Sequence, residues 1–284
     1  MNNEYCIFIL SHQRANNVKT YKSLRECGYT GQIVIVIDNE DDQADVYLKN
    51  FEHVEVFDKQ ATAMTFDIGD NFKHRGSVVY ARNACFDIAE KLNYKYFIEM
   101  DDDYSTFLFR LYSQENQIPK VIRNLDEVIK SWLTFYKSTN AHTIAMAQGG
   151  DFIGGKHNKV YAKNPTLTRK CMNSFLCSTD RRFTFVSRLN DDVTTYVSGS
   201  TKGLLTFTIP FCSIEQVQTQ KSTGGLTELY LKYGTYVKSF YSVMFQPSSV
   251  TVGWLQSSHK RIHHKVDSDK TYPKIIRESN KKTA

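Results

Sequence analysis

The sequence predicts an α/β protein built on a mixed, mostly parallel sheet flanked by helices. Three short runs are apolar along nearly their whole length: Tyr5–Leu10, Gln32–Ile37 and Tyr94–Met100. Such runs are typical of parallel strands that are covered on both faces. Each run stops at polar or acidic residues, and stretches with helical spacing separate the first runs. Strands that alternate with helices predict a doubly wound sheet with a polar carboxyl edge.

Composition and charge indicate an ordinary soluble globular protein. The chain has 284 residues, of which 41% are hydrophobic and 23% charged, and its formal net charge is +6. We expect a single domain over residues 1–284, because no repeat or low-complexity linker divides it. No apolar run is long enough to span a bilayer, and the N-terminal MNNEYCIFIL lacks the basic start of a signal peptide. We therefore expect a cytoplasmic protein with no membrane segment and reduced cysteines, and the charge mildly favours polyanionic partners.

In the first half of the chain, each expected element follows from its residue pattern. Gly28 ends the first helix as a C-cap, and the helix that precedes the strand Tyr94–Met100 has a clear apolar stripe. The expected strands are Tyr5–Leu10, Gln32–Ile37, Val54–Phe57, Tyr94–Met100 and Thr143–Ala147. The expected helices are Asn16–Cys27, Val78–Leu92 and Leu125–Tyr136.

Beyond about residue 155 the pattern changes and the elements become shorter. The expected strands are Thr184–Val186, Leu204–Pro210, Ser242–Phe245 and Val250–Leu255. Leu226–Ser239 has helical spacing, and Val193–Val197 predicts a short helix or a turn. The chain then ends in a basic and polar tail.

The stretch YKYFIEMDDDY, residues 94–104, carries the strongest functional signal. Asp101, Asp102 and Asp103 follow directly on an apolar strand, and three adjacent carboxylates repel one another unless a cation or solvent compensates them. Open α/β sheets place their ligands at this carboxyl edge. Hard oxygen ligands suit Mg²⁺ or Mn²⁺, which usually also contact substrate phosphates. The alternative is a solvated acidic turn without chemistry.

Two common phosphate-binding motifs are missing from the sequence. It contains no GxxxxGK[ST] loop, and no GxGxxG follows the first strand. The sheet must therefore bind its ligand in another way, and acidic strand ends with a metal ion are one such way.

Five segments together resemble the GT-A glycosyltransferases and, more narrowly, the TET/JBP-associated glycosyltransferases. They are SHQRANN, IDNEDDQ, GSVVYARNACFDIAEKLNYKYFIEMDDDY, RLNDDVTTY and HKRIHHK. That family is found largely in phages and is linked to sugar transfer onto hydroxylated bases in DNA. The resemblance implies a Rossmann-like GT-A sheet. Residues 1–155 would then bind the nucleotide sugar, and residues 156–284 would form a smaller acceptor-side half with the basic tail.

The resemblance also implies roles for residues of the donor site. Asp101 and Asp103 would bind Mn²⁺ or Mg²⁺, with Asp101 and Asp102 also close to the donor. Asp38 would contact the nucleotide base or ribose, unless it is a solvated strand end. Ser11 and Arg14 would meet the uracil or the diphosphate, and Arg82 would pair with Asp101 or a phosphate. The alternative for both arginines is ordinary surface charge.

A second acidic cluster, Asn190-Asp191-Asp192, matches the region where inverting GT-A enzymes carry a general base. We favour Asp192 over Asp191 as the group that takes the proton from the acceptor hydroxyl. The alternative is that the cluster only caps a helix. Gly149 and Gly150 would let the backbone approach the donor sugar, and Asp151 would bond its hydroxyls, unless these residues form a plain turn.

The histidines of the basic tail match another GT-A feature, a C-terminal histidine that completes the metal site. His263 or His264 would serve, since neutral imidazole binds Mn²⁺ well. Alternatively, HKRIHHK is a solvated or phosphate-contacting patch, in which Lys260, Arg261 and Lys265 attract a DNA backbone.

The resemblance therefore implies an inverting, metal-dependent transferase that would move a sugar from UDP-glucose or UDP-arabinose to a hydroxy or hydroxymethyl pyrimidine in DNA. That base must be flipped out of the stack or lie in a single strand. Two alternatives stay open: a GT-A transferase that acts on a glycan or protein, and a non-catalytic nucleic-acid-binding module.

Overall fold

The computed structural model describes residues 4–72, 75–113, 116–152, 170–216, 226–255, 260–271 and 278. The change of pattern expected near residue 155 and His259 of HKRIHHK lie outside these residues. Within these ranges, no helix combines the length and apolar character that crossing a membrane requires.

A nine-stranded mixed sheet runs through the described part of the chain, in the order β3-β2-β1-β4-β8-β7-β9-β5-β6. The pairing directions show that seven strands point one way and that β8 and β5 point the other way. The sheet is therefore mostly parallel, as predicted. Its strands are β1 Tyr5–Leu10, β2 Ile33–Asp38, β3 Val54–Phe57, β4 Tyr96–Asp101, β5 Tyr104–Ser113, β6 Asn116–Val121, β7 Thr143–Gln148, β8 Phe175–Ser178 and β9 Thr206–Gln216.

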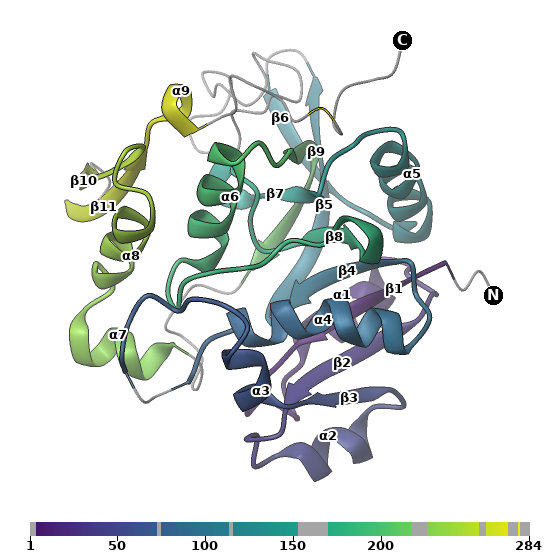
Figure 1. Cartoon of the computed structure of the whole chain (residues 1–284). Helices are drawn as coiled ribbons and strands as arrows, with labels where there is room; N and C mark the ends of the chain where they lie inside the picture. Colours follow the sequence, from purple (N-terminus) through teal and green to yellow (C-terminus); the bar gives the residue numbers. More distant parts are fainter. Residues whose placement is uncertain are drawn as a thin grey trace.

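Helices cover both faces of this sheet (Figure 1). Helices α1 and α5 pack on one face, and α4 and α6 pack on the other. The helices are α1 Lys19–Glu26, α2 Ala44–Asn50, α3 Lys59–Ala63, α4 Val79–Lys91, α5 Leu125–Lys137, α6 Asp191–Thr201, α7 Thr227–Tyr233, α8 Val237–Phe245 and α9 Ser268–Thr271, with short 3₁₀ turns at Gly149–Phe152 and Thr179–Arg181.

The central strands show why the apolar runs are continuous. In β1, Ile7 and Ile9 join the core on the α1 and α5 face, whereas Phe8 and Leu10 join the core on the α4 and α6 face. Successive side chains of a strand point to opposite faces, so a strand covered on both sides needs apolar residues at every position. β1 lies between β2 and β4, which run parallel to it. The carboxyl ends of these three strands therefore meet at one edge of the sheet.

A smaller unit, residues 226–271, lies beside α6 at the left of Figure 1. It comprises α7, α8 and α9 with an antiparallel two-stranded ribbon of β10 Val250–Leu255 and β11 Arg261–Val266. Asn190 Nδ2 donates to Ser242 Oγ of α8 at 2.7 Å, and Thr194 Oγ1 is 3.1 Å from the same oxygen. These bonds fasten the unit to the start of α6.

Several expected elements of the second half are wrong. Residues 184–186 have no regular secondary structure. The strand in this part of the chain is β8, which lies earlier in the sequence. Ser242–Phe245 ends helix α8 instead of forming a strand, since a short apolar run does not distinguish helix from strand. The helix expected over Leu226–Ser239 is divided into α7 and α8 at Gly234, whose φ of 85° is poorly tolerated by residues with a Cβ.

Candidate active site

A cavity of about 430 Å³ opens at the carboxyl edge of β1, β2 and β4. Its charged lining residues come from distant parts of the chain: Arg14, Asp38, Lys59, Arg82, Asp101, Asp102, Asp103, Asp191, Asp192 and Lys238. The two acidic clusters predicted from the sequence thus face one space. The lining also contains Ser11 and His12 from the end of β1.

Asp102 is held by the end of β1. Its Oδ2 accepts from Ser11 Oγ at 2.6 Å and its Oδ1 accepts from Arg14 Nη1 at 2.7 Å. Tyr47 of α2 braces the same loop, because its hydroxyl is 2.7 Å from Ser11 Oγ and accepts from the Arg14 backbone N–H at 2.8 Å. Asp102 is only 3% exposed, and its bonds hold the loop that follows β1 against the end of β4.

Asp101 and Asp103 make fewer contacts than Asp102. Asp101 Oδ1 accepts from Arg82 Nη2 at 3.1 Å, and Asp103 Oδ1 accepts from Gln216 Nε2 at 3.0 Å. Burial, outweighing the opposing effect of Arg82, raises the pKa of Asp101 to about 7, with neighbouring aspartates adding to the rise. Burial, with Asp102 beside it, also raises the pKa of Asp103. For both carboxylates, the nearby positive charge is thus too small to offset the effect of burial.

Arg82 bridges the two acidic clusters. Its guanidinium lies against the rings of Phe175 and Phe185, with Cζ 4.7 and 5.6 Å from the centroids, and the residue is 2% exposed. Besides Asp101, it pairs with Asp191, whose Oδ2 is 3.2 Å from Arg82 Nε but not aligned for a hydrogen bond. Arg82 therefore has Asp101 as its partner, one of the two alternatives expected for it.

Asp191 and Asp192 form the first turn of α6, where the helix dipole favours carboxylates. Asn190 precedes them with a left-handed φ of 58° and makes no side-chain capping bond, so capping alone does not account for the cluster. Burial raises the pKa of Asp191 to about 6 against the opposing effect of Arg82. Asp192 Oδ1 accepts the N–H of Val193 at 2.7 Å.

Asp38 ends β2 in a second group of charges. Its Oδ2 is 2.9 Å from His12 Nδ1 and its Oδ1 accepts from Lys59 Nζ at 3.1 Å. Burial raises the pKa of Asp38, but the bonds from His12 and Lys59 outweigh it, so the pKa lies below its usual value. Asp41 adds to the group, since its Oδ2 is 3.5 Å from His12 Nδ1.

The balance of charge in the cavity fits a divalent cation. The lining has six carboxylates and four cationic side chains. Lys59 compensates Asp38 and Arg14 compensates Asp102. Arg82 and Lys238 then remain for Asp101, Asp103, Asp191 and Asp192, which leaves a net charge of about −2 when every aspartate is ionised and histidine is neutral. In the described ranges, no three His, Cys, Asp or Glu side chains are grouped as a ready metal cage. Aspartates that share the metal with substrate phosphates and water suit this arrangement.

The two tail histidines lie on β11, outside the lining of the cavity. His264 Nδ1 is 3.2 Å from Nδ2 of Asn190, which does line it. Burial lowers the pKa of His264 to about 3, and His263, Lys238 and Lys170 lower it further, so His264 is neutral and accepts this bond. Burial followed by Lys238 lowers the pKa of His263. Their service as metal ligands stays a prediction.

The glycine turn after β7 lies apart from the cavity lining. Gly149, Gly150 and Asp151 form a 3₁₀ turn, and Asp151 Oδ2 accepts the N–H of Gln148 at 3.0 Å while its Oδ1 pairs with Lys170 at 2.9 Å. A Cβ on Gly149 would lie 2.9 Å from a Glu215 oxygen, which explains glycine there by packing. Contact of this turn with a donor sugar remains a prediction.

Some lining residues were not expected from the sequence, among them His12, Lys59, Asn173, Gln216 and Lys238. His12 could have been identified from the sequence, because it directly follows the first strand. Another signal is visible only in the structure: among the residues that it describes, four of the five non-glycine residues with positive φ, namely Gln13, Asn173, Ser187 and Asn190, lie in or next to the loops around the cavity. Such strained backbone gathers at functional sites.

A mostly parallel sheet with helices on both faces and an acidic site at its carboxyl edge is the GT-A architecture of glycosyltransferases. The chain belongs to the TET-Associated Glycosyltransferase family, whose model matches residues 5–225. A comparison with curated proteins found no match.

Solved structures of similar fold are distant in sequence. One is S. aureus TarS 1-349, with 10% identity and a TM-score of 0.45 over 85% of this chain and 65% of that chain. Another is the mannosyltransferase PcManGT from Pyrobaculum calidifontis in complex with GDP-Man and Mn²⁺, with 10% identity and a TM-score of 0.48 over 85% and 73%. A third is glucosyl-3-phosphoglycerate synthase from Mycobacterium tuberculosis with Mn²⁺, UDP and phosphoglyceric acid, with 8% identity and a TM-score of 0.42 over 93% and 87%. The chain thus spans slightly less than two thirds of TarS 1-349.

Proposed function

We propose that this protein is a metal-dependent, inverting glycosyltransferase that moves a sugar from UDP-glucose or UDP-arabinose to a hydroxy or hydroxymethyl pyrimidine in DNA. One observation carries the proposal: two acidic clusters, joined by the buried Arg82, face a single cavity at the carboxyl edge of the sheet. Family membership supports sugar transfer. In such a cavity, the nucleotide-sugar donor would bind on one side and the acceptor on the other.

The donor binds on the β1, β2 and β4 side. His12 and Lys59 orient Asp38, so that its carboxylate meets the ribose or base of the nucleotide. Arg14 lies at the mouth with its guanidinium on Asp102, where it also reaches an incoming diphosphate. Asp101 and Asp103 would hold the cation, which when bound neutralises the charge of the leaving diphosphate.

Asp192 is the better general base of the two carboxylates on α6. A general base must be ionised and free to accept a proton. Asp191 is engaged by Arg82, whose Nε lies 3.2 Å from Asp191 Oδ2, so its carboxylate is not free to take the proton. Asp192 makes its bond to the Val193 N–H through one oxygen and keeps the other for the acceptor hydroxyl. As that hydroxyl attacks the anomeric carbon, its proton passes to Asp192 and the bond to the UDP oxygen breaks on the opposite face.

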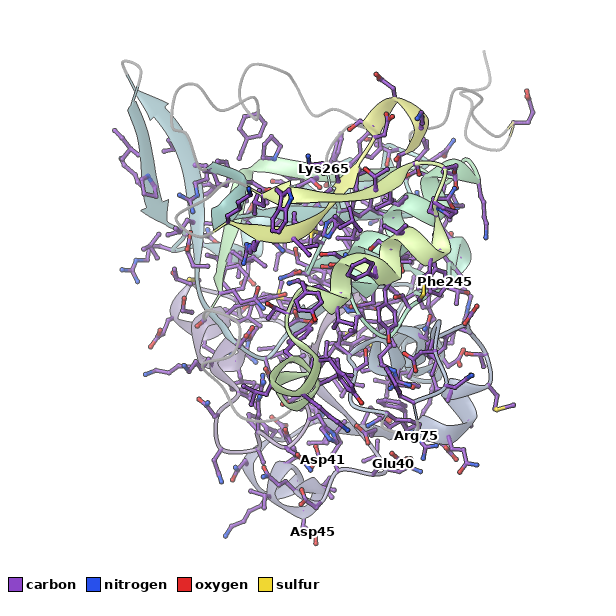
Figure 2. The ribbon with its side chains drawn as sticks, turned by 90° about the vertical axis from the view of Figure 1, so that its left-hand side faces the viewer. Glu40, Asp41, Asp45, Arg75, Phe245 and Lys265 are labelled. Carbon is purple, nitrogen blue, oxygen red and sulfur yellow. The ribbon has the colours of Figure 1, made fainter. Side chains whose placement is uncertain are left out.

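The basic residues of the smaller unit support a polyanionic acceptor. Lys238 lines the cavity, and burial lowers its pKa while Asp192 opposes this effect, which places the two side chains near each other. Arg261 and Lys265 extend positive charge along β11. Figure 2 shows Lys265 on this ribbon, far from the acidic loop that carries Glu40 and Asp41.

The direct test is transfer in vitro. Purified protein with Mn²⁺ and UDP-glucose or UDP-arabinose should add one sugar to DNA that contains 5-hydroxymethyl or 5-hydroxy pyrimidines, detected by mass spectrometry of the nucleosides. Asp101→Asn and Asp103→Asn should abolish transfer and the thermal stabilisation by UDP with Mn²⁺. Asp192→Asn should abolish transfer but keep that stabilisation. Asp45→Asn, an exposed aspartate on α2 (Figure 2), is the matched control and should match the wild-type protein.

The same experiment separates the alternatives. A chain that gains no stability from UDP and Mn²⁺ is not a donor-dependent transferase, because a ligand that binds the native state stabilises it. Stabilisation by the donor without transfer to any modified DNA would remove the DNA acceptor and favour a glycan or protein. Full transfer by the Asp101→Asn variant would contradict the assignment of the donor site.

A further inference from the structure

Exposed aromatic and aliphatic side chains gather on the smaller unit. Seven of its large hydrophobic residues are more than a third exposed: Leu231, Tyr233, Tyr236, Phe240, Met244, Val252 and Trp254. Cationic residues are interspersed with them: Lys232, Lys238, Lys260, Arg261 and Lys265. This unit begins at residue 226, directly after the match to the family model ends at residue 225. A surface of this kind on a soluble protein marks an interaction site.

The register of the ribbon relates this surface to the candidate active site. Val252 pairs with His264, and Trp254 pairs with Ile262. Residues two apart on a strand share a face, so Trp254 lies on the same face as His264, about 7 Å further along. His264 contacts Asn190, which lines the cavity next to the two α6 carboxylates. Trp254 therefore shares one face of the ribbon with a residue that contacts the lining of the cavity.

Positive charge lies beside this indole and on the opposite face of the ribbon. Lys260 Nζ lies 4.9 Å from the Trp254 ring centroid at the end of the ribbon. On the opposite face, a Cβ on Gly253 would lie 2.5 Å from Lys265 Cε, so glycine allows that lysine to lie across the ribbon. A cationic groove with exposed aromatic rings is the usual surface for unpaired nucleotides, whose bases stack and whose phosphates pair.

We propose that Trp254 and the lysines beside it bind unpaired nucleotides of the acceptor strand, with a base next to the target stacked on the indole. This inference rests on the DNA acceptor proposed above. Asp191 and Asp192 are 6% and 8% exposed, so a base inside an intact duplex cannot reach them. The target base must leave its stack, and its neighbour then loses a stacking partner. An indole that is 54% exposed replaces that partner.

Binding is measured with a short single-stranded oligodeoxynucleotide in the absence of donor and metal. The chain has two tryptophans, and Trp132 is 2% exposed in the core, so quenching of indole fluorescence reports on Trp254. We expect quenching in the wild-type protein, and dissociation constants from fluorescence anisotropy that weaken at least fivefold in Trp254→Ala. Trp254→Phe should keep the affinity within about threefold but lose the quenching.

Charge is tested in the same assay. Lys260→Ala should reduce the slope of log affinity against log salt, whereas Lys49→Ala, which removes an exposed charge on α2, should leave it unchanged. Matched duplex DNA should bind more weakly than the single strand and respond little to Trp254→Ala. The inference is overturned if the fluorescence does not change on binding, if Trp254→Ala binds within twofold of wild type, or if duplex DNA binds as tightly as the single strand.

The outcome is separable from that of the proposed function. Transfer to modified DNA with unchanged KM in Trp254→Ala would overturn this inference and leave the function standing. Failure of all transfer, with strand binding that still depends on Trp254, would remove the enzyme reaction and keep the surface. Because Trp254 is exposed, its replacement should leave the melting temperature nearly unchanged, so lost binding is not lost folding.

Discussion

Replacing Arg82 by methionine should destabilise the protein, and the loss should grow with pH. The guanidinium is buried against two aromatic rings and lies 3.1 Å from an Asp101 oxygen and 3.2 Å from an Asp191 oxygen. At an effective dielectric constant of about 20, each such contact corresponds to roughly 5 kcal/mol of attraction. Desolvation offsets much of this, and removing one partner of a buried ion pair costs about 3–5 kcal/mol because the remaining charges are uncompensated.

The pH dependence follows from the two carboxylates. Burial raises the pKa of Asp101 to about 7 and that of Asp191 to about 6, and Arg82 opposes both shifts. In Arg82→Met this opposition is lost, so both pKa values rise further above those of the unfolded chain. A carboxyl group with a raised pKa loses stability as the pH rises from its unfolded value through its folded one. The destabilisation should therefore be largest near pH 8. At pH 5, where both groups are protonated in either protein, it should be smaller by about 1.4 kcal/mol or more.

Urea unfolding in EDTA at pH 5 and pH 8, followed by far-UV circular dichroism, measures both losses. Arg182→Met is the control, since Arg182 pairs with Asp87 and Glu90 on the surface, where such pairs contribute at most about 1 kcal/mol. A loss for Arg82→Met that is equal at the two pH values, or below about 1 kcal/mol at pH 8, would refute the bridging role.

Three further outcomes test other parts of the molecule. Gly69→Ala should lower the free energy of unfolding by about 1–3 kcal/mol, since Gly69 has a φ of 79° and a Cβ there would lie 2.6 Å from the Phe245 ring; urea unfolding measures this. Asp38→Asn should destabilise the protein above pH 5, and the loss should shrink as the pH falls below about 4 towards the folded pKa of Asp38, which is depressed because its two basic neighbours outweigh its burial. Thermal stabilisation by UDP and Mn²⁺ should increase from pH 6 to pH 8 and vanish in Asp101→Asn, because a carboxyl group with a pKa of about 7 must lose its proton to bind a cation.

The first half of the fold was predictable chiefly because its central strands, β1, β2 and β4, are covered on both faces. β1 and β3 have the predicted ends, and β2 and β4 differ by one or two residues. β5 was missed: it begins after the aspartates, reverses direction and has a register shift near Tyr104, which breaks the regular pattern. The division of α7 from α8 at Gly234 was missed as well, because an isolated glycine is tolerated within a helical pattern.

The carboxylates of the site were predictable and their partners were not. Acidic residues directly after an apolar strand must lie at the carboxyl edge of the sheet, so Asp38 and Asp101 could be placed from the sequence. The pairing of Arg82 with Asp191, and of Asp102 with Ser11, joins segments distant in sequence and depends on packing. Local spacing carries no information about such contacts.

Under the proposed function, the geometry around Arg82 divides the remaining negative charge between the two substrates. Arg82 occupies one carboxylate of each acidic cluster, Asp101 on β4 and Asp191 on α6. Asp103 and Asp192 also line the cavity, and in the proposed mechanism Asp103 would serve the donor and Asp192 the acceptor. A cation held by Asp101 and Asp103 would weaken the hold of Asp101 on Arg82, so the guanidinium would pair more strongly with Asp191. Under the proposed mechanism, donor binding would then fix the first turn of α6, and with it Asp192, before the acceptor arrives.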